Sequence, residues 1–391
     1  MLESFFYVAQ GKIHLKEPGK PARQIESKFG RSLVDRNSQI QRRNSWKTQG
    51  TGAKFMSGSL LWGRQSEEGD EIPVVVNAVS RGTEPDEVLY SLSTHEVGGV
   101  FSLRGADEKR LLHTADFRVG HLSVHRPENK IACAVRTKGG SHIAVMQGDG
   151  REFTDVTQGD SLDLNPNWVP STAGQVIFQS SGIARNAGGV NVGVSPTRIE
   201  QVDIVSGEVT TLLEDERFDY LNPAMDTAGN LFCIRKPYIS PRQSFNPLRA
   251  ALDLVLLPFR LLYAVFQFAN FFTMRYTGNT LVSSGNMRQR EADLRQMIVM
   301  DNLYHATRAP GAFLNPQKQW KAPRSWELIR RTAVGEIDVL ERGVLTFDLL
   351  ENGSVLFSDG RRIVLRDSNG AKKELLKDEF ISQVLSRSNG E

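Results

Sequence analysis

Apolar and polar positions alternate over short segments along most of the chain, as expected for β-strands. The clearest segments are KIACAV (130–135), QVIFQSS (175–181), NLFCIR (230–235) and SVLFSD (354–359). Each is rich in β-branched or aromatic residues. The pattern predicts an all-β protein of short antiparallel strands.

Parts of this pattern repeat at a fixed offset. LNPNW at 164–168 recurs as LNPAM at 221–225, and the same offset relates Val145 to Val202. Both valines stand five residues before a glycine, and Leu365 repeats that spacing before Gly370. Cys133 and Cys233 occupy matching places in two of the strands, which predicts that both are buried. Such self-similarity indicates a repeat architecture.

The repeating unit is a four-stranded blade, and the chain is predicted to fold as a single β-propeller over 1–391 with two helical insertions. Six units are expected, at 5–65, 73–115, 119–158, 161–214, 217–331 and 343–380. Residues 5–29 align with 355–380, pairing Ile13 with Ile363 and Leu15 with Leu365, which predicts that the N- and C-terminal blades are neighbours in a closed ring. Five or seven blades, and a β-sandwich, are the alternatives.

The run DLNPNWVPSTAGQVIFQSS, with IEQVDIVSGEVTTLL and LSVHRPENKIACAVRTKGGSHIAVMQGDGREFTDVT, resembles the blades of TolB-like and WD-repeat-like propellers. The TolB-like repeat contains S-P-D-G, which this chain replaces by 169–172 (VPST) and 226–229 (DTAG). The resemblance covers about 115–240 and, in part, 340–380. It implies binding of a protein or peptide.

The insertion at 236–294 contains a long apolar segment at 246–275. Asn246, Asp253, Arg260 and Gln267 recur every seventh residue, so on a helix they form one polar stripe. The apolar face is predicted to contact a membrane or a partner through Leu254, Leu257, Phe259, Leu261, Leu262, Phe266, Phe268, Phe271 and Phe272. A single crossing would separate blades of one ring, so an in-plane helix or a re-entrant hairpin is expected. Burial against protein is the alternative.

Charge around this segment favours a membrane surface. From 275 to 331 the chain has ten basic and four acidic residues. The basic flank nearest the apolar segment comprises Arg249, Arg275, Arg288 and Arg290. Each basic group near an anionic leaflet contributes about 1 kcal/mol. A second basic insertion, 31–54, is predicted to form a short helix. If both insertions leave one face of the ring, that face would meet the membrane or partner.

Composition narrows the classes of function. The 391 residues carry a net charge of +3, too small to indicate a nucleic-acid partner. Two cysteines build no disulfide framework, and the first residues show no basic region ahead of an apolar stretch. The protein is therefore expected to be cytoplasmic, without a secretory signal.

The chain contains none of the common catalytic motifs: no G-x-S-x-G, phosphate loop, H-E-x-x-H or C-x-x-C occurs. His121 and His125 share one face of a predicted strand but have no third ligand nearby, so no metal or cofactor is expected. Five polar residues are predicted to precede the first strands of blades, near the channel mouth: Asp160, Asp163, Asn165, Asp219 and Asn222. They would hold a cation, polarise a substrate or cap turns.

Together these features predict a non-enzymatic propeller scaffold for protein–protein interaction, attached peripherally to a membrane or a membrane partner. The alternative is an enzyme or enzyme subunit, a hydrolase or lyase that uses the channel mouth. A further alternative is a subunit of a larger complex whose partner covers the apolar segment. The identity of the protein partner does not follow from the sequence.

Overall fold

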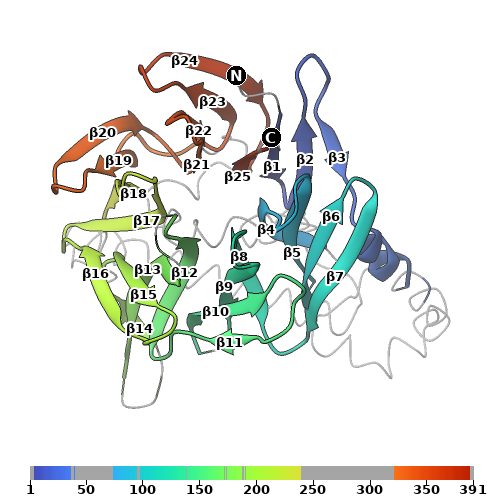
Figure 1. Ribbon diagram of the computed structural model, residues 1–391, viewed down its shortest axis with the longest axis horizontal. Coiled ribbons are helices and arrows are strands. Elements are labelled where there is room, and N and C mark those ends of the chain that lie inside the picture. Colours follow the sequence, from blue (N-terminus) through green and yellow to red (C-terminus); the bar gives the residue numbers. More distant parts are fainter. Residues whose placement is uncertain are drawn as a thin grey trace, which may run out of the picture. The chain divides into compact units, whose positions relative to one another are not determined.

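The computed structural model describes residues 4–36, 39, 74–238 and 321–387, except positions 95, 96, 138, 171, 173, 187, 188 and 190. The chain divides into two compact units, and the first is described over residues within 4–31, 74–238 and 321–387. This unit is a ring of six blades (Figure 1), in which the nine-stranded sheet holds two blades joined by one parallel pair, Ser141 with Leu162, and the four other sheets are one blade each. The all-β propeller predicted from the sequence is therefore confirmed.

Each blade has four strands, which follow one another from the axis of the ring outward. Blade 1 is β25 (Ile381–Ser386), β1 (Phe5–Ala9), β2 (Lys12–Lys16) and β3 (Arg23–Ile25). Blade 2 is β4 (Val75–Arg81), β5 (Glu87–Ser93), β6 (Gly98–Arg104) and β7 (Asp107–Thr114). Blade 3 is β8 (Arg118–His125), β9 (Lys130–Arg136), β10 (Ser141–Gln147) and β11 (Thr154–Asp155).

Blade 4 is β12 (Ser161–Trp168), β13 (Gln175–Arg185), β15 (Arg198–Asp203) and β16 (Val209–Leu213), and β14 (Asn191–Val194) extends β13. Blade 5 is β17 (Phe218–Met225), β18 (Leu231–Pro237), β19 (Glu327–Arg331) and β20 (Ile337–Arg342). Blade 6 is β21 (Thr346–Leu349), β22 (Val355–Ser358), β23 (Arg362–Arg366) and β24 (Lys372–Lys377). The fifth unit thus runs past its predicted end at 331, because β20 exposes most of its residues and resembles a surface loop in sequence.

The ring closes inside blade 1. Strand β25 supplies the innermost strand and pairs antiparallel with β1, Leu385 opposite Phe6. The alignment of the two end blades predicts that Ile13 and Ile363 occupy equivalent places. In the structure Ile13 pairs with Val8 in blade 1 and Ile363 pairs with Ser358 in blade 6, so each isoleucine pairs with the residue five positions before it. Closure by backbone hydrogen bonds removes two open sheet edges.

Apolar side chains between neighbouring blades form the core. Cys133 and Cys233 lie in the second strands of blades 3 and 5 and are fully buried, as their matching places in the sequence predicted. Burial raises the pKa of the Cys133 thiol to about 12, so it stays protonated. Both cysteines therefore act as small apolar core residues.

The repeated glycines sit in the turns that leave the third strands. Gly150, Gly207 and Gly370 have φ of 87°, 74° and 89°, a region that favours glycine. At Gly150 a Cβ would also lie 2.3 Å from the Leu111 carbonyl oxygen. This explains why the spacing from third strand to glycine recurs in blades 3, 4 and 6.

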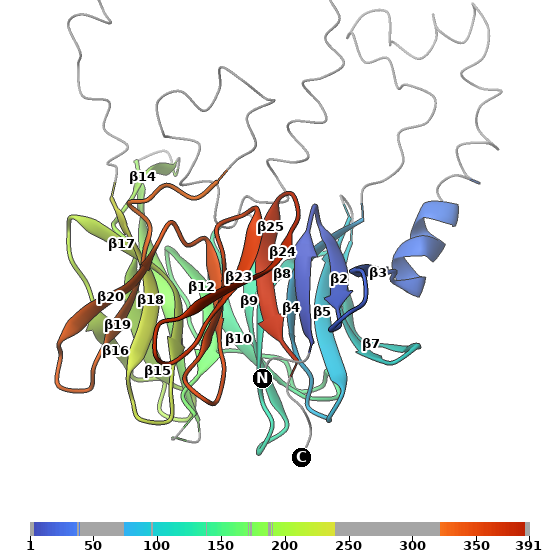
Figure 2. The ribbon, with the colours of Figure 1, turned by 90° about the horizontal axis from the view of Figure 1, so that it is seen from above.

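Both long connections leave the ring at one face. After β3, the chain returns to β4 beside the turn between β1 and β2, where Val76 N donates to Gly11 O at 2.8 Å. After β18, Tyr238 N donates to Arg217 O at 2.9 Å, at the start of β17. We call this side, where the inner strands begin, the insertion face, and the opposite side the distal face. In Figure 2 the insertion face is at the top.

The start of the first insertion is a helix at 28–36, which begins three residues before the predicted 31–54 segment. Ser27 caps it, because Ser27 Oγ accepts from Gly30 N at 3.0 Å. The Glu108 carboxylate of β7 also accepts from Lys28 N at 2.6 Å and from Phe29 N at 3.1 Å. These bonds attach the helix start to blade 2.

The predicted apolar helix at 246–275 lies outside the described residues, as does the rest of the insertion from 239 to 320. Its apolar face (Leu254, Leu257, Phe259, Leu261, Leu262, Phe266, Phe268, Phe271 and Phe272) and basic flank (Arg249, Arg275, Arg288 and Arg290) remain predictions. Within the described part of the chain, no helix is both long enough and apolar enough to cross a membrane.

Candidate functional site in the central channel

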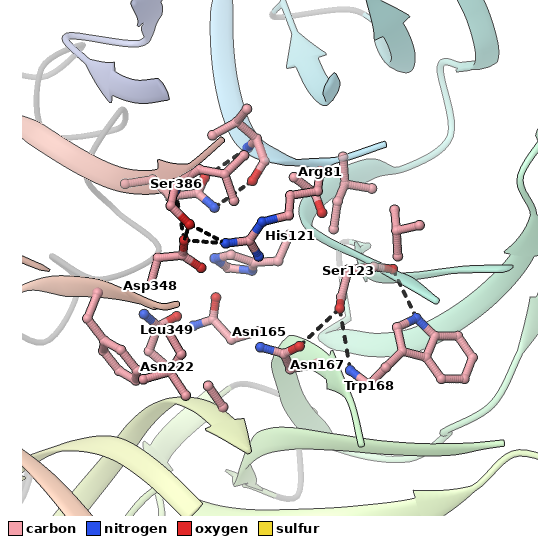
Figure 3. Close-up of a pocket in the computed structure, with 18 of the residues that line it drawn as sticks. Arg81, His121, Ser123, Asn165, Asn167, Trp168, Asn222, Asp348, Leu349 and Ser386 are labelled. Atoms are coloured by element: carbon pink, nitrogen blue, oxygen red, sulfur yellow. Dashed lines mark hydrogen bonds and ion pairs between the residues drawn. The ribbon is translucent and has the colours of Figure 1, made fainter. Parts of the chain in front are cut away.

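The inner strands of all six blades surround a cavity of about 1180 Å³ along the axis of the ring. Its lining includes Asn77, Arg81, His121, Ser123, His125, Asn165, Asn167, Asn222, Thr346, Asp348, Gln383 and Ser386. Figure 3 shows labelled side chains converging on it from different blades. Most of the polar groups in this wall are neutral amides and hydroxyls.

The charged pair of the channel joins three blades. Arg81 Nη2, at the end of β4, lies 2.6 Å from Asp348 Oδ2 of β21. Ser386 of β25 donates to the same oxygen from its backbone N at 2.7 Å and from its Oγ at 2.6 Å (Figure 3). The carboxylate is therefore engaged by donors from blades 1 and 2. This arrangement stabilises the closure of the ring.

A second contact crosses the same closure. The Gln383 side chain of β25 accepts from Val79 N at 2.8 Å and donates to Val79 O at 2.7 Å. One amide thus satisfies both backbone groups of a residue in β4, as a neighbouring strand would.

His121 is half-buried in β8 and lines the channel. Burial, with a smaller contribution from the charge of Arg136, lowers the pKa of His121 to about 3. Its Nδ1 is buried and makes no hydrogen bond among the described residues. The imidazole is therefore neutral at physiological pH.

His125 belongs to an interface between blades 3 and 4. Its ring centroid lies 5.2 Å from that of Trp168, and Trp168 Nε1 donates to Ser123 O at 3.1 Å. Ser123 Oγ donates to Asn167 Oδ1 at 3.1 Å (Figure 3). In the residues that the structure describes, no group of three His, Cys, Asp or Glu side chains is placed to hold a metal.

Asn165 and Asn222 lie within the inner strands β12 and β17 and line the cavity. Both have left-handed backbones, with φ of 51° and 58°, and both stand at irregularities in the pairing of the inner strand. Gln179 Oε1 accepts from Asn165 Nδ2 and from Asn222 N, each at 2.8 Å. The repeated Leu-Asn-Pro thus has the same geometry twice in this chain: an asparagine that tolerates positive φ forms a bulge beside the channel.

Asp163 and Asp219 do not precede the inner strands, contrary to the prediction from the sequence, but lie within them and are buried in the blades. Asp163 accepts from Thr157 Oγ1 at 2.6 Å and from Ser180 Oγ at 2.7 Å. Asp219 Oδ2 lies 3.2 Å from Lys236 Nζ. Burial lowers the pKa of Lys236, and Asp219 opposes that shift. These carboxylates therefore support the walls. Asp160, just before β12, pairs with Arg185 at 3.0 Å.

Sequence reasoning missed the residues that join the blades across the channel: Arg81, Asp348, Gln383 and Ser386. They come from three segments far apart in the chain, and no local motif links them. The one signal in the sequence is the alternating run ISQVLS at 381–386, which follows the last predicted blade. A closed ring requires one inner strand for each blade, and this run supplies the missing one.

Several polar side chains of the channel wall bond to one another. The hydroxyls of Ser386 and Ser123 donate to Asp348 and Asn167, and the Asp348 carboxylate is held by Arg81. Neutral amides and hydroxyls offer donors and acceptors to a polar ligand.

No family model matches the chain, and no curated protein matches it. Among solved structures, a chain in the crystal structure of a nidogen/laminin complex is 7% identical with a TM-score of 0.50, covering 97% of this chain and 96% of that one. TolB from Acinetobacter baumannii is 8% identical with a TM-score of 0.49, covering 98% of this chain and 66% of that one. The tricorn protease is 10% identical with a TM-score of 0.47, covering 95% of this chain and 33% of that one.

The chain resembles TolB-like β-propellers in fold. TolB proteins are thus among the solved structures to which the chain is similar. At these identities the likeness concerns the fold alone.

Proposed function

We propose that the protein is a propeller scaffold for protein–protein interaction, held at an anionic cytoplasmic membrane surface by the segment 246–275. The observation that carries the proposal is the position of the two connections. Both leave from the insertion face, and both have a basic excess in sequence. A membrane contact on this face leaves the rim and the distal face of the ring accessible to partners.

The sequence of 246–275 supports a shallow attachment. Its polar residues recur every seventh position, and the intervening residues are mainly Leu, Val and Phe. Such a segment lies in the interface rather than across it. Strands β19 to β25 follow the segment in sequence and belong to the same ring as strands β1 to β18, which precede it, and this also argues against a single crossing.

The geometry does not favour the enzyme alternative. Asp163 and Asp219, the acids that would hold a cation or polarise a substrate, are buried and bonded within the blade walls. The remaining candidates, Asn165 and Asn222, are neutral amides.

Flotation with lipid vesicles tests the proposal. We expect the full chain to float with vesicles of phosphatidylcholine and phosphatidylserine, and less with phosphatidylcholine alone, because the basic flank is attracted to anionic lipid. Leu257→Asp with Phe259→Asp places two charges on the predicted apolar face and is expected to reduce the floating fraction at least about tenfold.

The matched control adds the same two charges to the polar stripe, as Asn246→Asp with Gln267→Asp. This variant is expected to float almost as well as the wild type. If both variants float equally, or if the wild type does not float, membrane attachment through this segment is refuted. If only the apolar-face variant changes its oligomeric state in solution, the segment is a protein interface instead.

A further inference from the structure

The outermost strands of the six blades differ in what they present to solvent. The exposed residues of β3, β7, β11 and β24 are polar or charged, for example Lys373 and Glu374 on β24. Charged edges prevent a sheet from pairing with another chain. Within the described residues, the five exposed large apolar side chains are all on the β15–β16 and β19–β20 hairpins: Val205, Val209, Val334, Ile337 and Val339. The outer edges of blades 4 and 5 therefore present apolar side chains to solvent beside their polar ones.

Strand β20 carries the more regular of these two edges. Ile337 and Val339 are 42% and 43% exposed and two residues apart, so they share one face of the strand. Val339 pairs with Ile329, which is fully buried, so the exposed pair continues an apolar face outward from the core. On β16 only Val209 is an exposed apolar residue within the strand, followed by Thr210 and Thr211.

The backbone of β20 is available on one side. In the described part of the chain β20 is the last strand of its sheet, in the order β17, β18, β19 and β20 (Figure 1). Its outer N–H and C=O groups can therefore pair with one more strand, the geometry of β-strand addition.

Charge specifies the kind of strand that fits. Between 336 and 342 the chain has three acidic residues and one basic residue, which is Arg342. Arg342 pairs with Glu327 at 3.2 Å, Asp338 pairs with Arg330 at 2.7 Å, and Glu341 pairs with Lys372. Glu336, exposed at the turn, is therefore the acidic group that a partner strand can meet. A partner strand with Lys or Arg near Glu336 would complement this edge, because opposite charges across adjacent strands stabilise pairing.

We propose that β20 is the docking edge for a β-strand of a protein partner that has β-branched side chains at alternate positions and basic residues at its ends. The proposal rests on the scaffold function proposed above and assigns a surface to it. It is independent of the lipid contact, since β20 lies on the outer rim of blade 5.

The test uses the full chain and a fluorescein-labelled peptide, Lys-Lys-Val-Thr-Val-Thr-Val-Lys-Lys, with binding measured by fluorescence anisotropy. Ile337→Ser with Val339→Ser is expected to raise the dissociation constant about tenfold, because two cross-strand apolar contacts are lost. Glu336→Gln is expected to raise it about threefold at low salt and to have no effect at high salt, where the attraction is screened. All three residues are exposed, so the ring should melt as in the wild type.

Two controls locate the binding. Val209→Ser, on the other apolar edge, should leave the dissociation constant unchanged, and a peptide with proline in place of both threonines should not bind, since it cannot complete the ladder. The proposal is overturned if the wild type fails to bind the peptide, or if the double variant binds as the wild type does. It is also overturned if the chain sediments as a dimer that the double variant abolishes, since the edge would then serve a second copy.

Flotation separates this proposal from the one on which it rests. The β20 double variant should float with vesicles as the wild type does. Loss of peptide binding with flotation intact is expected for this variant. If the chain binds the peptide but does not float with vesicles, the proposal that β20 is a docking edge stands and only the membrane contact is refuted.

Discussion

In the inner strand β12, Asp163 and Asn165 are two residues apart but have different surroundings. A regular strand would present both side chains on one face. The left-handed backbone of Asn165 interrupts the alternation, so Asn165 lines the channel while Asp163 bonds to Thr157 and Ser180 inside the blade. Single backbone angles therefore decide which polar residues reach the site.

His121 gives a prediction on pH. Its pKa falls from 6.5 to about 3 in the folded chain, so below pH 6.5 the unfolded state takes up a proton that the folded state does not. Stability should therefore fall as the pH drops from 6.5 toward 3, by up to about 1.4 kcal/mol per pH unit from this group. We expect urea unfolding of His121→Gln to show a weaker decrease between pH 7 and 5 than the wild type.

A suitable control is His113→Gln, which changes an exposed imidazole on β7. Its pH dependence should follow that of the wild type. Parallel curves for His121→Gln and the wild type would contradict the interpretation that His121 is held neutral in the channel.

At the scale of elements, the blades are joined by side chains as well as by apolar packing. Gln383 in β25 satisfies both backbone groups of Val79 in β4, and Asp348 of β21 binds Ser386 of β25. Blade 1 is assembled from both ends of the described chain, so these contacts form only when the ring closes. They are therefore expected to couple closure to global stability.

Gln383→Ala should lower the free energy of unfolding by about 2 kcal/mol, because it leaves a buried N–H and a C=O without partners. The measurement is urea unfolding at neutral pH. Gln201→Ala, which removes a half-buried amide bond to Gln175 within blade 4, is the matched control and should cost less than about 1 kcal/mol. Equal losses for the two variants would show that closure contributes nothing beyond one ordinary hydrogen bond.

The sequence predicted the blades where their strands are apolar and where glycine turns recur. It was less informative about the outermost strand of blade 5, β20, and the innermost strand of blade 1, β25. β20 was missed although Ile337, Asp338 and Val339 alternate between apolar and polar, because this alternating run is short and all three residues are exposed. β25 was missed because half of ISQVLS is polar, and these residues bond across the closure. The repeated Leu-Asn-Pro motif drew attention to Asn165 and Asn222. Arg81 and Asp348 have no such signal, because they are far apart in sequence and come together only when the ring closes.

At the scale of the whole molecule, we expect the ring to fold separately from the long connection in blade 5. Strands β18 and β19 flank the connection and pair directly, with Arg235 Nη2 2.6 Å from Glu327 Oε2. Lys236 and Asp219 form a buried pair beside the point where the connection leaves. The sheet itself therefore holds both ends of the segment 239–320 in place.

Replacing 239–320 by a short Gly/Ser linker tests this separation. The ring should fold with its β-sheet spectrum unchanged. With a linker of about ten residues its free energy of unfolding should rise by about 2 kcal/mol, because the loop is halved about three times and each halving recovers about 0.6 kcal/mol of closure entropy. Flotation with anionic vesicles should be lost. A chain that fails to fold would place part of the segment in the core of the ring, and a folded chain that still floats would place the membrane contact elsewhere. Because stability and flotation are read on the same variant, a loss of flotation cannot be attributed to unfolding, and the role of the segment is separated from that of the blades.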